Sequence, residues 1–327
     1  MERCRYWPRI GEITMTISQS RIDKLSGWVP PEQRSYEVAK QHDILLSSTR
    51  VMSAAGANIA GSGEGKVVLL HKILEEVHGS FPVNRQTIGD CVSHGWCKGI
   101  EVLTAVEIAM KGENEEWPGK LQATEWVYGT SRVIQGGGRL GNGDGSLGSW
   151  AAAAVKENGT LLRDVYDGID LTRYSGKRAK DFGYRGLPTQ LEKIADEHPV
   201  QTCALVTSYE EARDAIANGY PVPVCSNQGF SDKRDSDGFA KPSGSWDHCM
   251  LFVSVDDEYK RPGLLCVNSW GTDWISGSLR HGQPEGSFWV DAETVDRMLR
   301  GRDSYAISNF KGYPARSLDY NLWTLAS

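Results

Sequence analysis

The sequence lacks a long apolar run and an excess of positive charge. Residues 1–20 begin with charged and bulky polar side chains, and they contain no stretch that could form the core of a signal peptide or a membrane span. The formal net charge is -6, which disfavours a nucleic-acid-binding protein because such proteins usually present a basic surface. We therefore expect a cytoplasmic protein that has neither nucleic acid nor a membrane as its partner.

The sequence also lacks the dense cysteine spacing of a disulfide-bonded framework. Its seven cysteines, at positions 4, 91, 97, 203, 225, 249 and 266, are an odd number spread over 327 residues. Free thiols fit a reducing compartment better than disulfides do. Hydrophobic residues make up 39% and charged residues 24% of the chain, which is normal for a soluble globular protein of one large domain or two ordinary ones.

Periodic patterns predict helices in the first half of the chain and strands in the second. Apolar spacing predicts helices over 36–46, 67–77, 91–110, 124–134, 150–157 and 209–218. Strand-like runs cover 221–225, 249–255, 264–267 and 287–290. A helical lobe at 80–203 followed by a β lobe at 204–310 is an α+β arrangement, with a cleft expected between the lobes. Residues 1–79 are an N-terminal extension of unknown role, and residues 311–327 are a C-terminal tail.

The most informative motif is Asn268-Ser269-Trp270-Gly271, which follows an apolar strand pattern. An Asn there can fix the tautomer and tilt of a histidine ring, and Trp270 can shield that hydrogen bond from water. His248 lies at the mouth of another apolar strand, 20 residues before Asn268. Two adjacent antiparallel strands would place His248 and Asn268 side by side.

A candidate nucleophile lies further upstream, at Cys91. It opens a long amphipathic helix pattern, and the partial positive charge at a helix N-terminus favours thiolate over thiol. Taken alone, Cys91 is more simply a buried structural cysteine. A thiol, an imidazole and an orienting amide in the order Cys91, His248, Asn268 are what acyl transfer by a cysteine enzyme needs.

These blocks resemble the signature segments of the papain-like cysteine peptidases. The resemblance rests on Cys91 at the start of a helix, on Asp247-His248 leading a strand, and on Asn268-Ser-Trp-Gly followed by Gly286-Ser-Phe-Trp-Val. It covers roughly residues 80–310. It implies a two-lobe fold with a helical lobe and an antiparallel β-sheet or barrel lobe.

The resemblance also implies roles for individual residues. Cys91 would be the nucleophile, His248 its base and later acid, and Asn268 the group that orients His248, with Asp247 and Trp270 supporting the site. The reaction would be hydrolysis of a protein or peptide substrate through an acyl-enzyme.

The sequence departs from the papain-like pattern at the oxyanion hole. The usual Gln lies six residues before the nucleophile, but that position is Arg85, and Gln86 follows it. A small local shift of the chain would place Gln86 as the hydrogen-bond donor to the oxyanion. Alternatively, Arg85 would donate the hydrogen bond to the oxyanion. Loss of one such donor costs about a hundred- to a thousandfold in rate.

Three other interpretations stay open or are disfavoured. Cys91, His94 and Cys97 recur at the spacing of metal ligands, but steps of three on a helix turn these side chains away from one another, so we expect no metal and no cofactor. A papain-like fold kept as a structural or assembly subunit, for example of a viral particle, would carry an idle triad, and its assembly partners are unknown. Acyl transfer to an amine would use the same three residues as hydrolysis.

Overall fold

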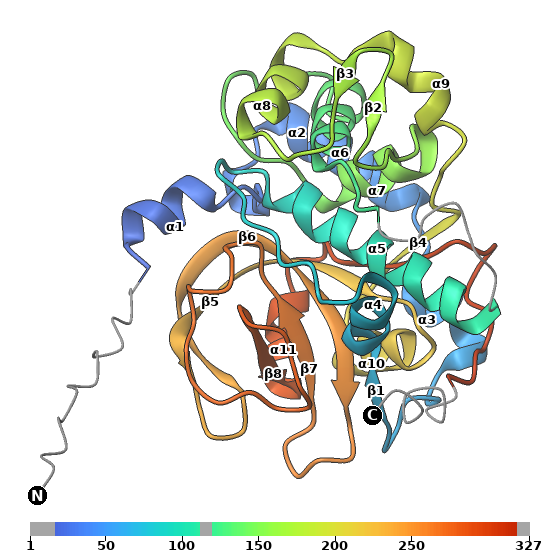
Figure 1. Ribbon diagram of the computed structural model, residues 1–327, viewed down its shortest axis with the longest axis vertical. Coiled ribbons are helices and arrows are strands. Elements are labelled where there is room, and N and C mark those ends of the chain that lie inside the picture. Colours follow the sequence, from blue (N-terminus) through green and yellow to red (C-terminus); the bar gives the residue numbers. More distant parts are fainter. Residues whose placement is uncertain (1–16, 112–119, 319–327) are drawn as a thin grey trace, which may run out of the picture.

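A long helix, α5 (Cys91–Lys111), lies between a helical lobe and a lobe built on an antiparallel sheet (Figure 1). The structure is a computed structural model that describes residues 17–111 and 120–318. No helix within these ranges is long and apolar enough to cross a bilayer. The α+β, two-lobe architecture expected from the sequence is confirmed.

The helical lobe consists of short helices on one side of α5. Its members are α2 (Tyr36–Ser48), α6 (Thr124–Gly129) with the π-helical turn η3 (Thr130–Gln135), α7 (Gly148–Glu157), α8 (Gly176–Arg185), η4 (Thr189–Leu191) and α9 (Glu192–Ala195). A hairpin of β2 (Val165–Tyr166) and β3 (Ile169–Asp170) joins them. Side chains from α6, α8 and η4 form a separate small apolar core, which holds this lobe together independently of the sheet.

The second lobe is an open antiparallel sheet in the order β1-β6-β7-β8, with β5 also paired to β6. The strands are β1 (Val67–Leu69), β5 (Val222–Arg234), β6 (Ala240–Asp256), β7 (Gly263–Val267) and β8 (Ser287–Asp291). Helices α4 (Leu70–His78), α10 (Tyr209–Ala217) and α11 (Ala292–Leu299) pack around it. The strands pair as a sheet that does not close into a barrel.

A short pair of strands joins the end of the helical lobe to the end of the sheet lobe. Strand β4 (Thr202–Leu205) pairs with β9 (Tyr305–Ser308), from Thr202 opposite Ser308 to Leu205 opposite Tyr305. Both strands are almost completely buried. The sequence patterns did not predict either strand.

The helix predicted over 67–77 is wrong for its first three residues. Val67, Val68 and Leu69 form β1, which pairs with β6 at Asp256, Val255 and Ser254, and the helix begins only at Leu70. The other helices and strands occur where the sequence predicted them, although β5 and β6 extend well beyond the predicted runs. Residues 67–69, near the end of the N-terminal extension, thus contribute directly to the central sheet, while the boundary of the extension at residue 79 stays a prediction.

The described part of that extension begins with a helix and then crosses the molecule. Helix α1 (Gln19–Leu25) leads into an extended stretch, which is followed by η1 (Pro31–Gln33) and α2. We call residues 25–29, from the last residue of α1 onward, the cleft segment. Short helices α3 (Met52–Ala55) and η2 (Ala57–Ile59) lead on to β1. In Figure 1, α1 and the start of α2 lie beside the junction of the two lobes, next to one end of β5 and β6.

Candidate active site

Cys91 is the first residue of α5 and lies where the two lobes meet. Its side chain is completely buried, and its Sγ accepts a hydrogen bond from the backbone N–H of Cys249 on β6 at 3.3 Å. Burial raises the pKa of the Cys91 thiol well above its usual value, with the neighbouring Cys225 and Asp90 adding to the rise. This burial opposes the effect of the helix N-terminus, which the sequence analysis expected to favour the thiolate.

His248, within β6, and Asn268, directly after β7, are hydrogen bonded to each other. The His248 Nε2 lies 2.8 Å from Asn268 Oδ1, which also accepts the backbone N–H of Ser269 at 2.7 Å. Because the amide oxygen can only accept, His248 carries its proton on Nε2 and presents a lone pair at Nδ1. The register of β6 with β7, which pairs Leu251 with Val267, places these residues at the same end of the sheet.

The His248 ring lies in a dry, aromatic environment. Trp270 covers it with ring centroids 4.6 Å apart, and Trp246 and Trp274 pack against Trp270 in turn. Burial lowers the pKa of His248 to about 4, the hydrogen bond to Asn268 opposes that fall, and His94 contributes to it. His248 is thus a neutral imidazole at neutral pH in this arrangement.

The structure does not hydrogen bond Cys91 to His248. Within the described residues, His248 Nδ1 has no hydrogen-bond partner, and the Cys91 sulfur is held by the peptide group that follows His248. The two side chains are therefore neighbours from opposite lobes, both buried and both uncharged.

The two candidates for the oxyanion hole point in different directions. Arg85 lies at the surface, where its guanidinium pairs with Asp273 at 2.5 Å. Gln86 is buried, its Oε1 accepts the Ser269 hydroxyl at 2.5 Å, and its Nε2 donates to the carbonyl oxygens of Ile88 at 2.7 Å and Leu25 at 2.8 Å. Of the two side chains, Gln86 is therefore the one that faces the interior and already holds a peptide carbonyl.

The cleft segment covers the site as an extended peptide. The N–H groups of Gly27 and Trp28 both donate to the backbone oxygen of Asp247 at 3.0 Å. On the other side, Ser146 N–H donates to Gly27 O at 2.8 Å, and Val29 N–H donates to Ser146 O at 3.0 Å. This pattern is a parallel bridge between Trp28 and Ser146. The segment thus bridges the helical lobe and the sheet lobe directly over Cys91.

Two features fix the cleft segment in place. Gly27 packs so closely on Gly89 that a Cβ atom at Gly27 would lie 2.0 Å from the Gly89 carbonyl oxygen, so only glycine fits there. Trp28 is 3% exposed, and its indole N–H donates to Asp303 Oδ2 at 2.8 Å. The same carboxylate accepts the N–H groups of Gly148 and Ser149 at the start of α7.

The sequence analysis identified the polar groups of the site but not the segment that covers it. Asp247 enters through its backbone oxygen, while its side chain accepts Gln33 Nε2 at 2.8 Å. Residues 25–29 were missed, because they bind mainly through backbone groups that every residue possesses. Among residues 17–111 and 120–318, no group of three His, Cys, Asp or Glu side chains is placed to hold a metal ion.

Fold and site together define a two-lobe protein with the architecture of the papain-like cysteine proteases, which it resembles. No family profile and no curated protein matches the sequence. Among solved structures, it is similar to xylellain, a cysteine protease from Xylella fastidiosa, with a TM-score of 0.53 and 16% identity over 90% of this chain and 99% of that one. It is also similar to digestive procathepsin L 3 of Tenebrio molitor larval midgut, with a TM-score of 0.48 and 13% identity over 74% and 69% of the two chains. At such identities, the likeness establishes the fold alone.

Proposed function

We propose that this protein is a cysteine peptidase that is held latent by its own cleft segment. The observation that carries the proposal is the contact of Gln86 Nε2 with the Leu25 carbonyl oxygen, in a segment bound along the cleft by backbone hydrogen bonds. A cleft that binds one extended peptide through backbone groups can bind another of different sequence. Protein or peptide substrates are therefore the class that this site fits.

The proposed reaction starts when the cleft segment leaves. Water then reaches the site, the desolvation that raises the pKa of Cys91 and lowers that of His248 falls, and the free Nδ1 of His248 can accept the thiol proton. The imidazolium is stabilised by its Nε2–H hydrogen bond to Asn268. The thiolate at Cys91 attacks the substrate carbonyl carbon.

The following steps use the groups already described. Gln86 Nε2 and the backbone N–H of Cys91 would donate to the developing oxyanion. His248 would then protonate the leaving amine, and water activated by the same ring would hydrolyse the acyl-enzyme and regenerate the thiol. An amine that replaced this water would give acyl transfer instead of hydrolysis.

A second candidate function is favoured by the same covered cleft. Cys91, His248 and Asn268 are 0%, 0% and 2% exposed. A papain-like subunit that serves only in assembly would keep these three side chains buried permanently. In that case the cleft segment would be a structural strand and not a removable cover. We also propose a reducing, cytoplasmic location, which the six free cysteines in the described ranges support.

The test is a substitution that dislodges the cleft segment without altering a site residue. Gly27→Ala places a methyl group against the Gly89 carbonyl oxygen, where there is no space. Gly143→Ala is the matched control, because its added Cβ meets only Leu140 O at 3.3 Å. Each variant is treated with iodoacetamide, the modified cysteines are mapped by mass spectrometry, and hydrolysis of a fluorogenic peptide library is measured.

Each outcome separates the two candidate functions. A latent peptidase gives rapid alkylation of Cys91 over Cys97 and peptide hydrolysis in Gly27→Ala, neither of which survives the further change Cys91→Ala. Enhanced Cys91 alkylation without turnover of any peptide would point to an idle site in an assembly subunit. No enhanced alkylation and no turnover would refute the peptidase proposal.

A further inference from the structure

A second cavity, distinct from the cleft, opens between α5 and the helical lobe. Its volume is about 290 Å³, at the lower end of small-ligand sites. The wall includes three arginines, Arg85, Arg163 and Arg173, and one acidic residue, Glu101. Its other polar residues are Asn84, His94, Gln122, Thr124 and Tyr174. None of the cleft-segment residues lines it.

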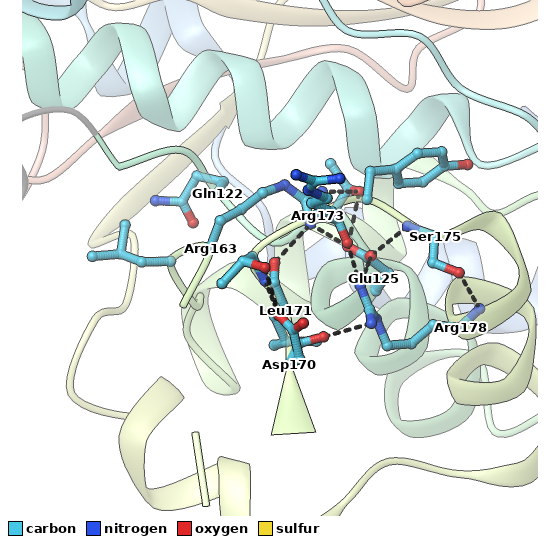
Figure 2. A network of polar contacts seen from close by, with 12 residues as sticks. Gln122, Glu125, Arg163, Asp170, Leu171, Arg173, Ser175 and Arg178 are labelled. Carbon is cyan, nitrogen blue, oxygen red and sulfur yellow. Dashed lines mark hydrogen bonds and ion pairs between the residues drawn. The ribbon is translucent and has the colours of Figure 1, made fainter. Parts of the chain in front are cut away.

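Two of the three arginines in this wall are paired with carboxylates, Arg85 with Asp273 and Arg163 with Glu125. Glu125, which is completely buried, accepts one hydrogen bond from Arg163 at 3.0 Å and one from Arg178 at 3.0 Å, so one carboxylate serves two guanidinium groups. Figure 2 shows Glu125 at the centre of this network, between Arg163 and Arg178. Arg178 does not line the cavity, and Arg85 is paired with Asp273, so Arg173 is the one wall arginine still to be considered.

Arg173 adds a further positive charge. It is exposed, and its guanidinium forms no ion pair or hydrogen bond among the described residues. The acidic residue of the wall does not balance it, because Glu101 is already paired with Lys98 and accepts the backbone N–H of Gln122 at 2.9 Å. The hydrogen bonds from Thr172 and the charges of Arg178 and Arg173 lower the pKa of Asp170, on the neighbouring hairpin, so its carboxylate offsets part of the Arg173 charge.

Gln122 supplies an independent sign of a ligand. Its side chain is 1% exposed, yet neither its Nε2 nor its Oε1 has a hydrogen-bond partner within the described residues. Burying a side-chain amide whose N–H and oxygen both lack a hydrogen-bond partner costs free energy of folding. Such a group in a native protein usually hydrogen bonds to a bound water, ion or ligand. Gln122 lies in the same cavity wall as Arg163 and Arg173.

We propose that this cavity binds a small oxyanion, a phosphate or a carboxylate, between Arg173, Arg163 and the Gln122 amide. Guanidinium groups bind both anions through paired N–H donors, and the Gln122 Nε2 would supply a neutral donor from the buried side. Arg85, one of the two oxyanion-hole candidates, also lines this cavity, but the proposed anion ligands do not include it, so either proposal can fail without the other.

The test is isothermal titration of the full chain with inorganic phosphate and, separately, with acetate, at constant ionic strength. The variants are Arg173→Ala and Gln122→Leu, with Arg300→Ala as the control because Arg300 is also exposed and lies on α11's end, away from the cavity. We expect saturable binding of at least one anion, weakened about tenfold or more by either cavity variant and unchanged by the control.

The thermal midpoint without ligand provides a second readout that does not depend on which anion binds. Gln122→Leu removes an unpaired buried amide, so we expect it to hold or raise the midpoint while it weakens anion binding. Binding of phosphate alone or of acetate alone would identify the source of the oxyanion. Absence of saturable binding for both anions, or equal loss in Arg300→Ala, would overturn the proposal.

Discussion

At the residue scale, Gln86 and Arg85 differ in what surrounds them more than in their distance from Cys91 along the chain. Gln86 is fixed by the Ser269 hydroxyl and by the Ile88 carbonyl, whereas Arg85 extends to Asp273 at the surface. A donor that is fixed before the reaction stabilises developing charge without reorganisation. The offset of one residue from the papain-like pattern is thus compatible with a working oxyanion donor.

Substitution of these two residues should separate their roles. In the Gly27→Ala background, Gln86→Ala should lower kcat/KM for peptide hydrolysis by about a hundred- to a thousandfold, since one oxyanion donor is lost. Arg85→Ala should change it by less than about threefold, because an exposed ion pair contributes little. The measurement is steady-state hydrolysis, with circular dichroism confirming the fold. A larger loss for Arg85→Ala than for Gln86→Ala would assign the donor to Arg85.

A different buried residue, His71, should make stability depend on pH. His71 bonds to the Ser254 hydroxyl at 2.8 Å, and burial lowers its pKa to about 3, with Lys72 and His281 nearby. Its folded pKa lies below the unfolded value of about 6.5, so the unfolded state takes up the proton first and stability falls as the pH drops from about 6.5 towards 3.

The His71 contribution at pH 5 is about 2 kcal/mol, from the 1.5-unit gap to the unfolded pKa. We therefore expect His71→Gln to reduce the loss of unfolding free energy between pH 7 and pH 5 by about that amount. Urea denaturation at the two pH values measures it. Burial also lowers the pKa of His78, but this side chain is less deeply buried than His71. A His78→Gln variant should therefore show a smaller effect. Equal pH dependence in wild type and His71→Gln would contradict the assignment.

At the element scale, the parts that the sequence predicted are those with strong local patterns. Helix α5 and the strands β7 and β8 follow from apolar spacing, and the order of Cys91, His248 and Asn268 follows from motifs. Strand β1 has apolar residues that continue the pattern of α4, and only its pairing with β6, almost 190 residues away, makes it a strand. Local patterns carry no information about such a partner.

The cleft segment was beyond prediction for a related reason. Four of its hydrogen bonds, two to Asp247 and two to Ser146, are between backbone groups and need no particular side chain. Its side-chain-specific contacts, of Gln86 with the Leu25 carbonyl oxygen, of Trp28 with Asp303 and of Gly27 with Gly89, join residues that lie far apart in the chain. Burial raises the pKa of Cys91, and because this burial depends on the tertiary fold, it was equally invisible in the sequence.

The anchor of the cleft segment at Trp28 can be tested as an element. Trp28→Phe keeps an aromatic side chain but removes the indole N–H that donates to Asp303. Loss of this hydrogen bond should lower the free energy of opening the segment by about 1–2 kcal/mol, so the segment opens more often. We expect Cys91 alkylation to rise about five- to thirtyfold, because each 1.4 kcal/mol is a factor of ten. Trp150→Phe is the control, since the Trp150 indole N–H has no partner in the described ranges. An equal rise in both variants would mean that Trp28 anchors the segment by packing alone.

At the scale of the whole molecule, the cleft segment ties the two lobes together. It bonds to Ser146 in the helical lobe and to Asp247 in the sheet lobe, and α5 lies beneath it. The lobes are also joined by the buried β4–β9 pair and by one apolar core that extends from α5 into the sheet. The β4–β9 pair does not involve residues 25–29, whereas Leu25 and Trp28 belong to that core, so departure of the segment would leave the strand pair in place but remove two buried side chains from the core.

Two cysteines of α5 can show whether the cover opens before the molecule unfolds. Cys91 and Cys97 are both completely buried in the same helix, but only Cys91 lies under the cleft segment. If the segment opens as a local unit, Cys91 should react with iodoacetamide in urea well below the unfolding midpoint, with a weak dependence on urea because little surface is exposed. Cys97 should react only with the steep dependence of global unfolding, followed in parallel by tryptophan fluorescence. Identical urea dependence for both thiols would mean that the cover never opens in the folded protein, which is the behaviour of a structural subunit and not of a latent peptidase.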